Sequence, residues 1–375
     1  MKRFYQIGLT FLLSFLLANC ANNCFHPIYS ENELLCEPWF KYQHINPNSW
    51  RPPCTTTMGY SNINPLSMMK TRIPDCITHI VVNGNFFVQI EGEQDHNTLA
   101  VVGSNASVRE VSVKVINHTL YLEQDCGKSL CSMEMPAVVH LGIGKLDELL
   151  QAGNGDIIGK NIVSSHLNIV STGQGNVFLS GEMNVTDIQQ WGNGVTSILG
   201  AYTHCLNILV RSNGTVNLTG KVGVQSINKT GCGEINILGV TSNSLDIFSS
   251  GSGMINLIGC ATNLHKLIAT GNSSVYLNSA NSNNMYVIEH DNAQVGIAGN
   301  INNLNVKTSN YSRFQGRYLH SRSAYVTTQD YSHANILASR KAFAAAYGDS
   351  SIYFFGHRNI LSYYINGRGR VVAVS

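Results

Sequence analysis

The sequence predicts an all-β fold, a β-solenoid of about twelve coils with 19–20 residues in each coil. Two observations predict it. A triplet of small residues recurs at nearly constant spacing through residues 151–375, and apolar residues alternate with a period of two on either side of each triplet. The composition agrees, because only 12% of the residues are charged and 34 are glycine, which is typical of a turn-rich β protein.

The recurring triplet marks one coil after another. Near-identical copies such as GCGEINILG and GSGMINLIG lie 20 residues apart, and the spacing between successive triplets stays between 18 and 20 residues. Regularity over so many copies indicates a stack of equal coils. The third residues of the triplets are Gly155, Gly175, Gly194, Gly214, Gly233, Gly253, Ser273, Ala293, Ser312, Ser332, Ser350 and Gly369.

Apolar alternation around each triplet predicts two short strands per coil. Val177 and Leu179 follow a triplet, and Leu167 and Ile169 show the same alternation before it. A period of two is typical of a strand with one buried face, so each coil should contain two strands joined by a tight glycine turn. In that turn the glycines, and the Asn residues at the middle triplet position, should take a positive φ.

Stacking explains why the chain repeats itself. Two strands cannot bury an apolar face alone, whereas coils stacked about 4.8 Å apart close a continuous core. Asn217, Asn236 and Asn256 occupy one outward column on successive coils and should form an amide ladder. A transmembrane barrel would also alternate, but its strands need about nine to eleven residues, more than these short alternating segments provide.

Residues 1–20 have the pattern of an export signal. Lys2 and Arg3 precede the apolar run of residues 8–18, which is too short for a permanent membrane-spanning helix. The run ends in Leu-Ala-Asn-Cys, which resembles a bacterial lipobox, so we expect Cys20 to be lipidated and the protein to be placed at the outer membrane, the cell surface or the periplasm. Asn19 departs from the usual small residue there, so simple secretion with cleavage after Cys20 stays an alternative.

Residues 21–76 form a different, irregular segment rich in proline and cysteine. In an oxidising compartment its cysteines, together with Cys126 and Cys131, should staple loops as disulfides, with a pairing that the sequence does not reveal. Residues 77–150 should supply the first strands and an N-terminal cap of the solenoid, and residues 151–375 its repeats. Cys205, Cys232 and Cys260 occupy different repeat positions and are expected to be buried thiols. The cysteines predicted to form disulfides are Cys24, Cys36, Cys54, Cys76, Cys126 and Cys131.

The segment ITHIVVNGNFFVQIEG and its continuation to residue 123, followed by GNGDIIG and GQGNVFLSG, resembles the head-GIN family of exported proteins known as auto-transporter adhesins. The resemblance covers residues 77–260 closely and the later coils loosely. It implies a right-handed parallel β-helix and an adhesive role. The family offers no catalytic residue, cofactor or metal ligand to carry over to this sequence.

The C-terminal coils carry an unusual charge. Residues 301–375 hold nine basic and two acidic side chains, a local charge of +7 in a chain whose total is +2. Ten of the sixteen tyrosines lie between Tyr276 and Tyr364. Guanidinium groups and tyrosine rings together suit an acidic glycan or an anionic protein surface, with nucleic acid disfavoured outside the cell. The candidate binding residues are Tyr311, Arg313, Arg317, Arg322, Tyr325, Tyr331 and Tyr353.

The same residues also admit a purely structural interpretation. Tyrosine favours strands, and arginine keeps a weakly charged solenoid soluble. The last coil could be protected from edge pairing by Arg368 and Arg370, or could be covered by a second chain in a homo-oligomer. A structural role in assembly of the cell envelope is therefore an alternative to glycan binding.

An enzyme is the remaining alternative. Asp291 and Asp330 share the first triplet position two coils apart, roughly 10 Å, which would suit an inverting pair of carboxylates on a polysaccharide. Asp at the first position of a turn ordinarily caps that turn, so we expect a structural role and no catalysis. Gly153-Asn-Gly-Asp156 resembles one calcium-binding repeat, but Asn176 and Val195 replace Asp in the next coils, so no metal or cofactor is expected.

Overall fold

The computed structural model describes residues 67–125 and 136–374. The chain is all-β and forms a β-solenoid of about eleven turns. Its described residues fall into two compact units, an N-terminal unit of residues 67–125, 136–235 and 250–254 and a C-terminal unit of residues 236–249 and 255–374. In the described part of the chain, helix is limited to α3 (Asn105–Arg109) and the 3-10 turn η2 (Arg358–Ile360).

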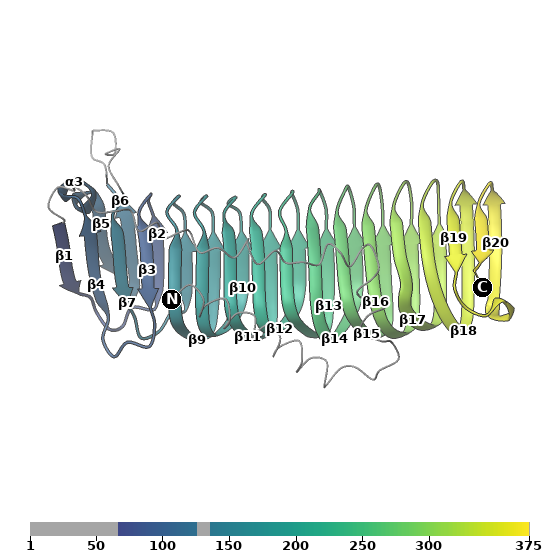
Figure 1. The fold of residues 1–375 in the computed structure, drawn as a ribbon, viewed down its shortest axis with the longest axis horizontal. Coiled ribbons are helices and arrows are strands. Elements are labelled where there is room, and N and C mark those ends of the chain that lie inside the picture. Colours follow the sequence, from purple (N-terminus) through teal and green to yellow (C-terminus); the bar gives the residue numbers. More distant parts are fainter. Residues whose placement is uncertain (1–66, 126–135, 375) are drawn as a thin grey trace, which may run out of the picture. The chain divides into compact units, whose positions relative to one another are not determined.

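The N-terminal unit begins with short strands and continues with long ones (Figure 1). β2 pairs in parallel with β6 and β8, and β3 with β7 and β9, whereas the pairs β1–β4, β4–β7 and β5–β6 are antiparallel. The strands are β1 (Ser67–Arg72), β2 (His79–Asn83), β3 (Phe87–Glu91), β4 (Thr98–Gly103), β5 (Val111–Ile116), β6 (Thr119–Gln124), β7 (Val138–Gly142), β8 (Glu148–Gln151), β9 (Ile157–Ser171), β10 (Val177–Gln190), β11 (Val195–Val210) and β12 (Thr215–Lys229).

The C-terminal unit stacks one long parallel strand per coil from β15 to β18, as Figure 1 shows. After β18 the coil is divided between β19 and β20, and the last triplet is followed only by β21 among the described residues. The final coil is thus incomplete, so twelve triplets give about eleven turns. The strands are β13 (Ile235–Ser249), β14 (Met254–Ala269), β15 (Ser274–Glu289), β16 (Gln294–Thr308), β17 (Arg313–Thr328), β18 (His333–Gly348), β19 (Ser351–Phe354), β20 (Leu361–Gly367) and β21 (Arg370–Ala373).

From β9 to β18 each coil contains one bent strand of 14–16 residues where the sequence predicted two short ones. The bend lies inside the strand, at Gly181, Gly200 and Gly220, whose φ values are +142°, +88° and +140°. Glycine adopts positive φ without strain, so the chain turns a corner while the ladder on either side of the bend continues. The register shifts at Leu179/Gly181 and Leu199/Ala201 mark this corner.

The triplet turn uses glycine for a second reason. A Cβ atom on Gly194 would overlap the carbonyl oxygen of Gly175 on the coil below, so close stacking excludes a side chain there. The prediction that middle-position Asn residues take positive φ is wrong. In the C-terminal unit the first triplet residue takes it instead, with φ of 63° at Asp291, 61° at Asn310 and 61° at Asp330.

Inward columns of apolar side chains form the core, as the alternation predicted. Val275, Val295, Phe314, Ala334 and Ile352 oppose one another on five successive strands and are each 0% exposed. Burying a side chain of the Val, Ile or Phe class contributes about 1.5–3 kcal/mol. Repetition of such columns on every coil stabilises the stack.

A second inward column, at the end of each long strand, is mostly polar in the N-terminal unit, with Val210 as an apolar member between Gln190 and Lys229. Gln151, Gln190 and Lys229 lie in register there and are each 0% exposed. Their side chains donate hydrogen bonds to carbonyl oxygens of the triplet turns, including Gly153 O and Gly231 O. Burial lowers the pKa of the Lys229 amine. These donors satisfy turn carbonyls that face away from water.

The amide ladder predicted at Asn217, Asn236 and Asn256 stays a prediction, but this column is more buried than the sequence suggested. Asn217 and Asn256 are only 9% and 4% exposed, and the Asn217 amide donates to Ser197 Oγ at 3.2 Å. These strands supply polar residues to a buried position where the sequence suggested a surface. Amide pairs do form on other columns of the C-terminal unit, between Asn292 and Asn272 (3.0 Å), Asn302 and Asn283 (2.7 Å), and Asn303 and Asn284 (2.9 Å).

The cysteine predictions need correction in the described residues. Cys205 and Cys232 are exposed and Cys260 is half-buried, so the expectation of buried thiols is wrong; Cys232, for example, occupies the middle of a triplet turn, where side chains point to solvent. Cys76 is exposed and forms no disulfide with another described residue, and because its five predicted partners lie outside the described residues its disulfide stays a prediction. Cys20, the export signal and the remaining cysteines of the predicted disulfide set lie outside the described residues.

Candidate functional site

Tyr311 and Tyr331, two candidate binding residues, stand side by side at the triplet turns. Each occupies the middle of its triplet, so adjacent coils bring the rings together with centroids 5.2 Å apart and an interplanar angle of 4°. They are 60% and 51% exposed. Because the two rings cover one face of each other, this pair stabilises the stack and presents its ring edges and hydroxyl groups to solvent.

Arg313 and Tyr353 lie on the strand that follows the triplet turn. Arg313 on β17 opposes His333 on β18. Tyr353 lies on β19, in a different column, where it opposes Asn335 of β18. Burial, together with the Arg313 charge, lowers the pKa of His333. His333 Nδ1 and Ser351 Oγ share a short hydrogen bond. In the column of Arg313, His333 and Ser351, the Arg313 side chain is therefore charged and the His333 side chain is neutral around pH 7.

Arg317 and Tyr325 point in other directions. The Arg317 guanidinium lies 4.9 Å from the centroid of Phe355 and 5.7 Å from that of Tyr318, so it is engaged by aromatic rings. Tyr325 lies beyond the bend of β17, with Lys341 Nζ 5.5 Å from its ring centroid. The seven predicted residues therefore occupy several faces of the coils and do not form one site.

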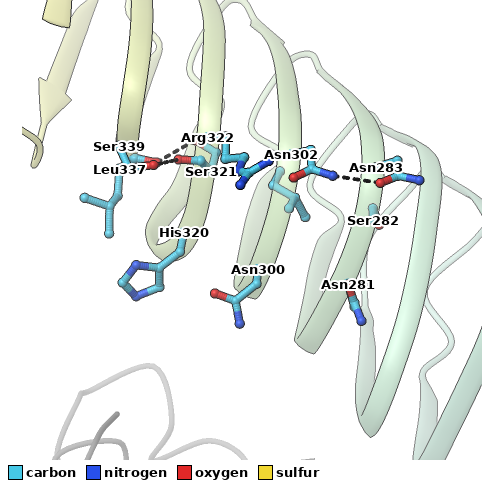
Figure 2. Close-up of a pocket in the computed structure, with 11 residues that line it drawn as sticks. Asn281, Ser282, Asn283, Asn300, Asn302, His320, Ser321, Arg322, Leu337 and Ser339 are labelled. Carbon is cyan, nitrogen blue, oxygen red and sulfur yellow. Dashed lines mark hydrogen bonds between the residues drawn. The ribbon is translucent and has the colours of Figure 1, made fainter. Parts of the chain in front are cut away.

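Arg322, the remaining candidate, lines a groove of about 360 Å³ on β15, β16, β17 and β18 (Figure 2). The groove lies beside the bend of four consecutive strands, where the chain turns from one face of the coil to the next. Its lining is polar apart from two aliphatic side chains and contains no carboxylate. The lining residues are Asn281, Ser282, Asn283, Asn300, Ile301, Asn302, His320, Ser321, Arg322, Leu337 and Ser339.

Serine hydroxyls fix the floor of this groove. Ser321 Oγ donates to Leu337 O at 2.6 Å, Ser282 Oγ donates to Leu264 O at 3.0 Å, and Ser339 Oγ donates to Ser321 O at 3.4 Å. Ser282 and Ser321 are 4% and 3% exposed. Hydroxyls that bond across coils hold the neighbouring strands in fixed register, so the groove is built on rigid elements.

Two side chains give the groove its electrostatic character. Arg322 is exposed and forms no hydrogen bond or ion pair with another described residue. Burial lowers the pKa of His320, so its imidazole is neutral near pH 7 and can donate one hydrogen bond and accept another. A guanidinium without a carboxylate partner makes the groove attractive to anions.

Sequence reasoning identified Arg322 but missed His320 and the asparagines around it. Their common feature is a shared column: Asn281, Asn300 and His320 oppose one another on consecutive strands and are separated in the sequence by one coil length. Figure 2 shows these three side chains directed to the same side of the strands. Polar residues that recur at the coil spacing could therefore have indicated the site.

Asp291 and Asp330, the residues of the enzyme alternative, serve the turns. Asp291 Oδ2 accepts a hydrogen bond from Gly271 N at 3.0 Å, and its Oδ1 accepts one from Asn310 Nδ2 at 3.1 Å. Asp330 Oδ2 accepts one from Asn310 N at 3.2 Å. Both carboxylates thus accept hydrogen bonds from the turn of the preceding coil, where the sequence predicted that each would cap its own turn. In the described residues no three His, Cys, Asp or Glu side chains cluster closely enough to hold a metal ion.

Membership of a family follows from comparison of the sequence. The chain is a β-solenoid protein of the family described as "Putative auto-transporter adhesin, head GIN domain", to which it belongs through a match over residues 77–263 and 250–357. This confirms the resemblance found in the sequence. The adhesin description of the family indicates an exported or surface protein. No curated protein matches the chain, and no helix in the described part of the chain is long and apolar enough to cross a membrane.

Three solved structures are similar to the chain. A "putative adhesin" from Parabacteroides distasonis is 16% identical, with 83% of this chain and 97% of that chain covered and a TM-score of 0.30. One from Bacteroides fragilis is 14% identical, with coverage of 83% and 98% and a TM-score of 0.27. One from Parabacteroides merdae is 13% identical, with coverage of 83% and 96% and a TM-score of 0.27.

Proposed function

We propose that this chain is an exported, non-enzymatic adhesion scaffold whose C-terminal unit binds acidic glycans. The observation that carries the proposal is a set of basic side chains without acidic partners. Residues 301–375 hold nine Lys and Arg side chains, and among the described residues only Arg368 forms an ion pair, with Asp349 at 2.8 Å. Unpaired cations on a rigid surface attract anionic partners and do little for the stability of the fold.

Family membership supports an adhesive role. The family description names adhesins, and the two carboxylates suited to glycoside hydrolysis are engaged in turn capping. Exposed tyrosine and asparagine side chains, which pair well with sugar rings and hydroxyls, accompany the cations on the same coils. Two alternatives to glycan binding are binding to an anionic protein surface and a structural role in the cell envelope.

A salt-dependent binding experiment tests the proposal. Purified protein is applied to immobilised acidic and matched neutral polysaccharides at about 0.1 M and about 1 M salt, where the Debye length falls from about 10 Å to about 3 Å. We expect retention on the acidic polysaccharides only, and loss of most of it at high salt. Equal retention on neutral polysaccharides, or none on either, would contradict glycan binding. Recovery of specific proteins, with no sugar bound, would favour the envelope-assembly alternative.

The proposal includes a lipid anchor at Cys20. Its support is the apolar segment at residues 8–18 followed by the lipobox-like ending, which together suit lipidation of a bacterial envelope protein. Expression in a bacterium fed radioactive palmitate should label the wild type, and Cys20→Ser should abolish the label. Cys24→Ser is the matched control and should retain it. A Cys20→Ser protein that stays labelled would contradict the anchor.

A further inference from the structure

The groove beside Arg322 contains a set of polar groups that the fold leaves unused. The side-chain amides of Asn281 and Asn300 make no hydrogen bond to another described residue, and neither does the Arg322 guanidinium. In the Asn302–Asn283 pair, the hydrogen bond from Asn302 Nδ2 to Asn283 Oδ1 leaves one donor group and one acceptor atom free. Figure 2 shows these groups in two rows along β15, β16 and β17, with Asn281 and Asn300 in one row and Asn283, Asn302 and Arg322 in the other, and both rows line the groove.

The serine hydroxyls of the groove are already engaged in hydrogen bonds within the fold. Ser282, Ser321 and Ser339 donate to backbone carbonyl oxygens and so define a fixed floor. The structure thus separates groups that build the groove from groups that are available to a ligand. A preformed site of this kind loses little conformational entropy when a ligand binds.

The charged and amide side chains that line the groove indicate the chemistry of the ligand. One guanidinium, no carboxylate and several amides line the groove. A single planar guanidinium suits one carboxylate, with two parallel hydrogen bonds, whereas a polyphosphate or a polysulfated chain would need several cations in the same cavity. Amides donate and accept hydrogen bonds, so they match hydroxyl groups better than they match further charges.

We propose that this groove binds one carboxylate-bearing sugar residue, a uronic or sialic acid unit, with the carboxylate held by Arg322 and the hydroxyls held by Asn281, Asn300 and the Asn302–Asn283 pair. The groove volume of about 360 Å³ lies at the lower end of the roughly 300–1,000 Å³ of small-molecule sites, which suits a short segment of a glycan. Leu337, which is half-buried, supplies apolar surface for the ring carbons. The inference rests on the proposed function and places its recognition step in this groove.

Titration calorimetry with a matched set of sugars tests the inference. The probes are sialyllactose and trigalacturonate, which carry carboxylates, sulfated lactose, which carries a sulfate, and lactose, which is neutral. We expect the wild-type protein to bind the two carboxylated sugars and to bind lactose and sulfated lactose at least about tenfold more weakly. Sulfated lactose that binds as well as sialyllactose would overturn the assignment to a carboxylate.

Two variants localise the binding. Arg322→Gln removes the only cation of the groove and should weaken binding of the carboxylated sugars about tenfold or more, since a charge-assisted pair is lost. Lys266→Gln is the matched control, because it removes an exposed cation that lies outside residues 301–375 and does not line the groove, and it should change the affinity less than roughly twofold. Circular dichroism spectra equal to that of the wild type establish that both variants fold.

The outcomes separate the inference from the proposed function. If acidic sugars bind but Arg322→Gln binds them as the wild type does, the groove assignment is overturned and the adhesive function stands. If the wild type binds no acidic sugar in either assay, both fail. Chemical labelling with phenylglyoxal, read by mass spectrometry, gives an independent check: Arg322 should react in the free protein and be protected by sialyllactose. Unchanged labelling in the presence of a sugar that binds would also overturn the assignment.

Discussion

Replacement of Glu289 by Gln should change how the stability of the protein depends on pH. Glu289 ends strand β15, is 0% exposed, and neither of its carboxyl oxygens has a hydrogen-bond partner among the described residues. Burial raises the pKa of this carboxyl well above its usual value of 4.5. The equivalent strand-end positions of the N-terminal unit hold donors such as Gln190 and Lys229, whereas here the chain places an acid.

The sign and size of the effect follow from proton linkage. The folded state binds the Glu289 proton more tightly than the unfolded state, so its contribution to stability is full below about pH 4.5 and falls as the pH rises toward the raised pKa. While the folded carboxyl stays protonated, each pH unit costs about 1.4 kcal/mol. Above the unfolded-state pKa the wild type should therefore lose, at up to this rate per pH unit, stability that Glu289→Gln keeps, until the pH reaches the raised pKa of the folded carboxyl.

Urea denaturation followed by far-ultraviolet circular dichroism at several pH values measures the effect. The difference in unfolding free energy between Glu289→Gln and wild type should grow in favour of the variant as the pH rises. Glu182→Gln, which removes an exposed carboxyl and leaves Glu289 in place, should keep the wild-type loss. Parallel pH profiles for wild type and Glu289→Gln would refute the reasoning, since they would mean that the buried carboxyl does not titrate differently on folding.

Three further changes probe the solenoid itself. Gly220→Ala places a side chain at φ +140°, against the backbone of the coil below, and should lower the unfolding free energy by about 1–3 kcal/mol in urea titrations; an unchanged midpoint would contradict the bend. Lys229→Met keeps the buried methylene groups but removes the donor to the turn carbonyls, with an expected cost of about 1–3 kcal/mol by the same measurement; wild-type stability would show that those carbonyls need no donor. A double-mutant cycle on Tyr311→Ala and Tyr331→Ala should give a coupling of about 0.5–1.5 kcal/mol by thermal denaturation, whereas additive effects would show that the stacked rings do not interact.

The coil repeat could be predicted because every coil satisfies the same local constraints. Val177, Leu179, Leu167 and Ile169 alternate in the sequence and are all buried in the structure. The bend was less evident in the sequence. The apolar alternation is interrupted there, which predicts the end of a strand, whereas in the structure the strand turns and continues. Its signal was the glycine that ends GEINILG and recurs one coil earlier at Gly220, a position that needs a positive φ.

The candidate site depended on geometry that the sequence does not carry. Tyr311, Arg313, Arg322 and Tyr325 are close in sequence, yet a bent coil sends them to different faces, because each face takes only a few consecutive residues. The charge of residues 301–375 was a property of composition and was predictable. Which cation lacks a partner and borders a cavity depends on the side chains of four neighbouring strands.

A crystal structure of the protein grown with sialyllactose tests the central claim most directly. The account predicts the sugar in the groove on β15–β18, with its carboxylate within hydrogen-bond distance of the Arg322 guanidinium and its hydroxyls against the asparagine side chains. A sugar bound on another face of the C-terminal unit, or an acidic group held by cations other than Arg322, would contradict it.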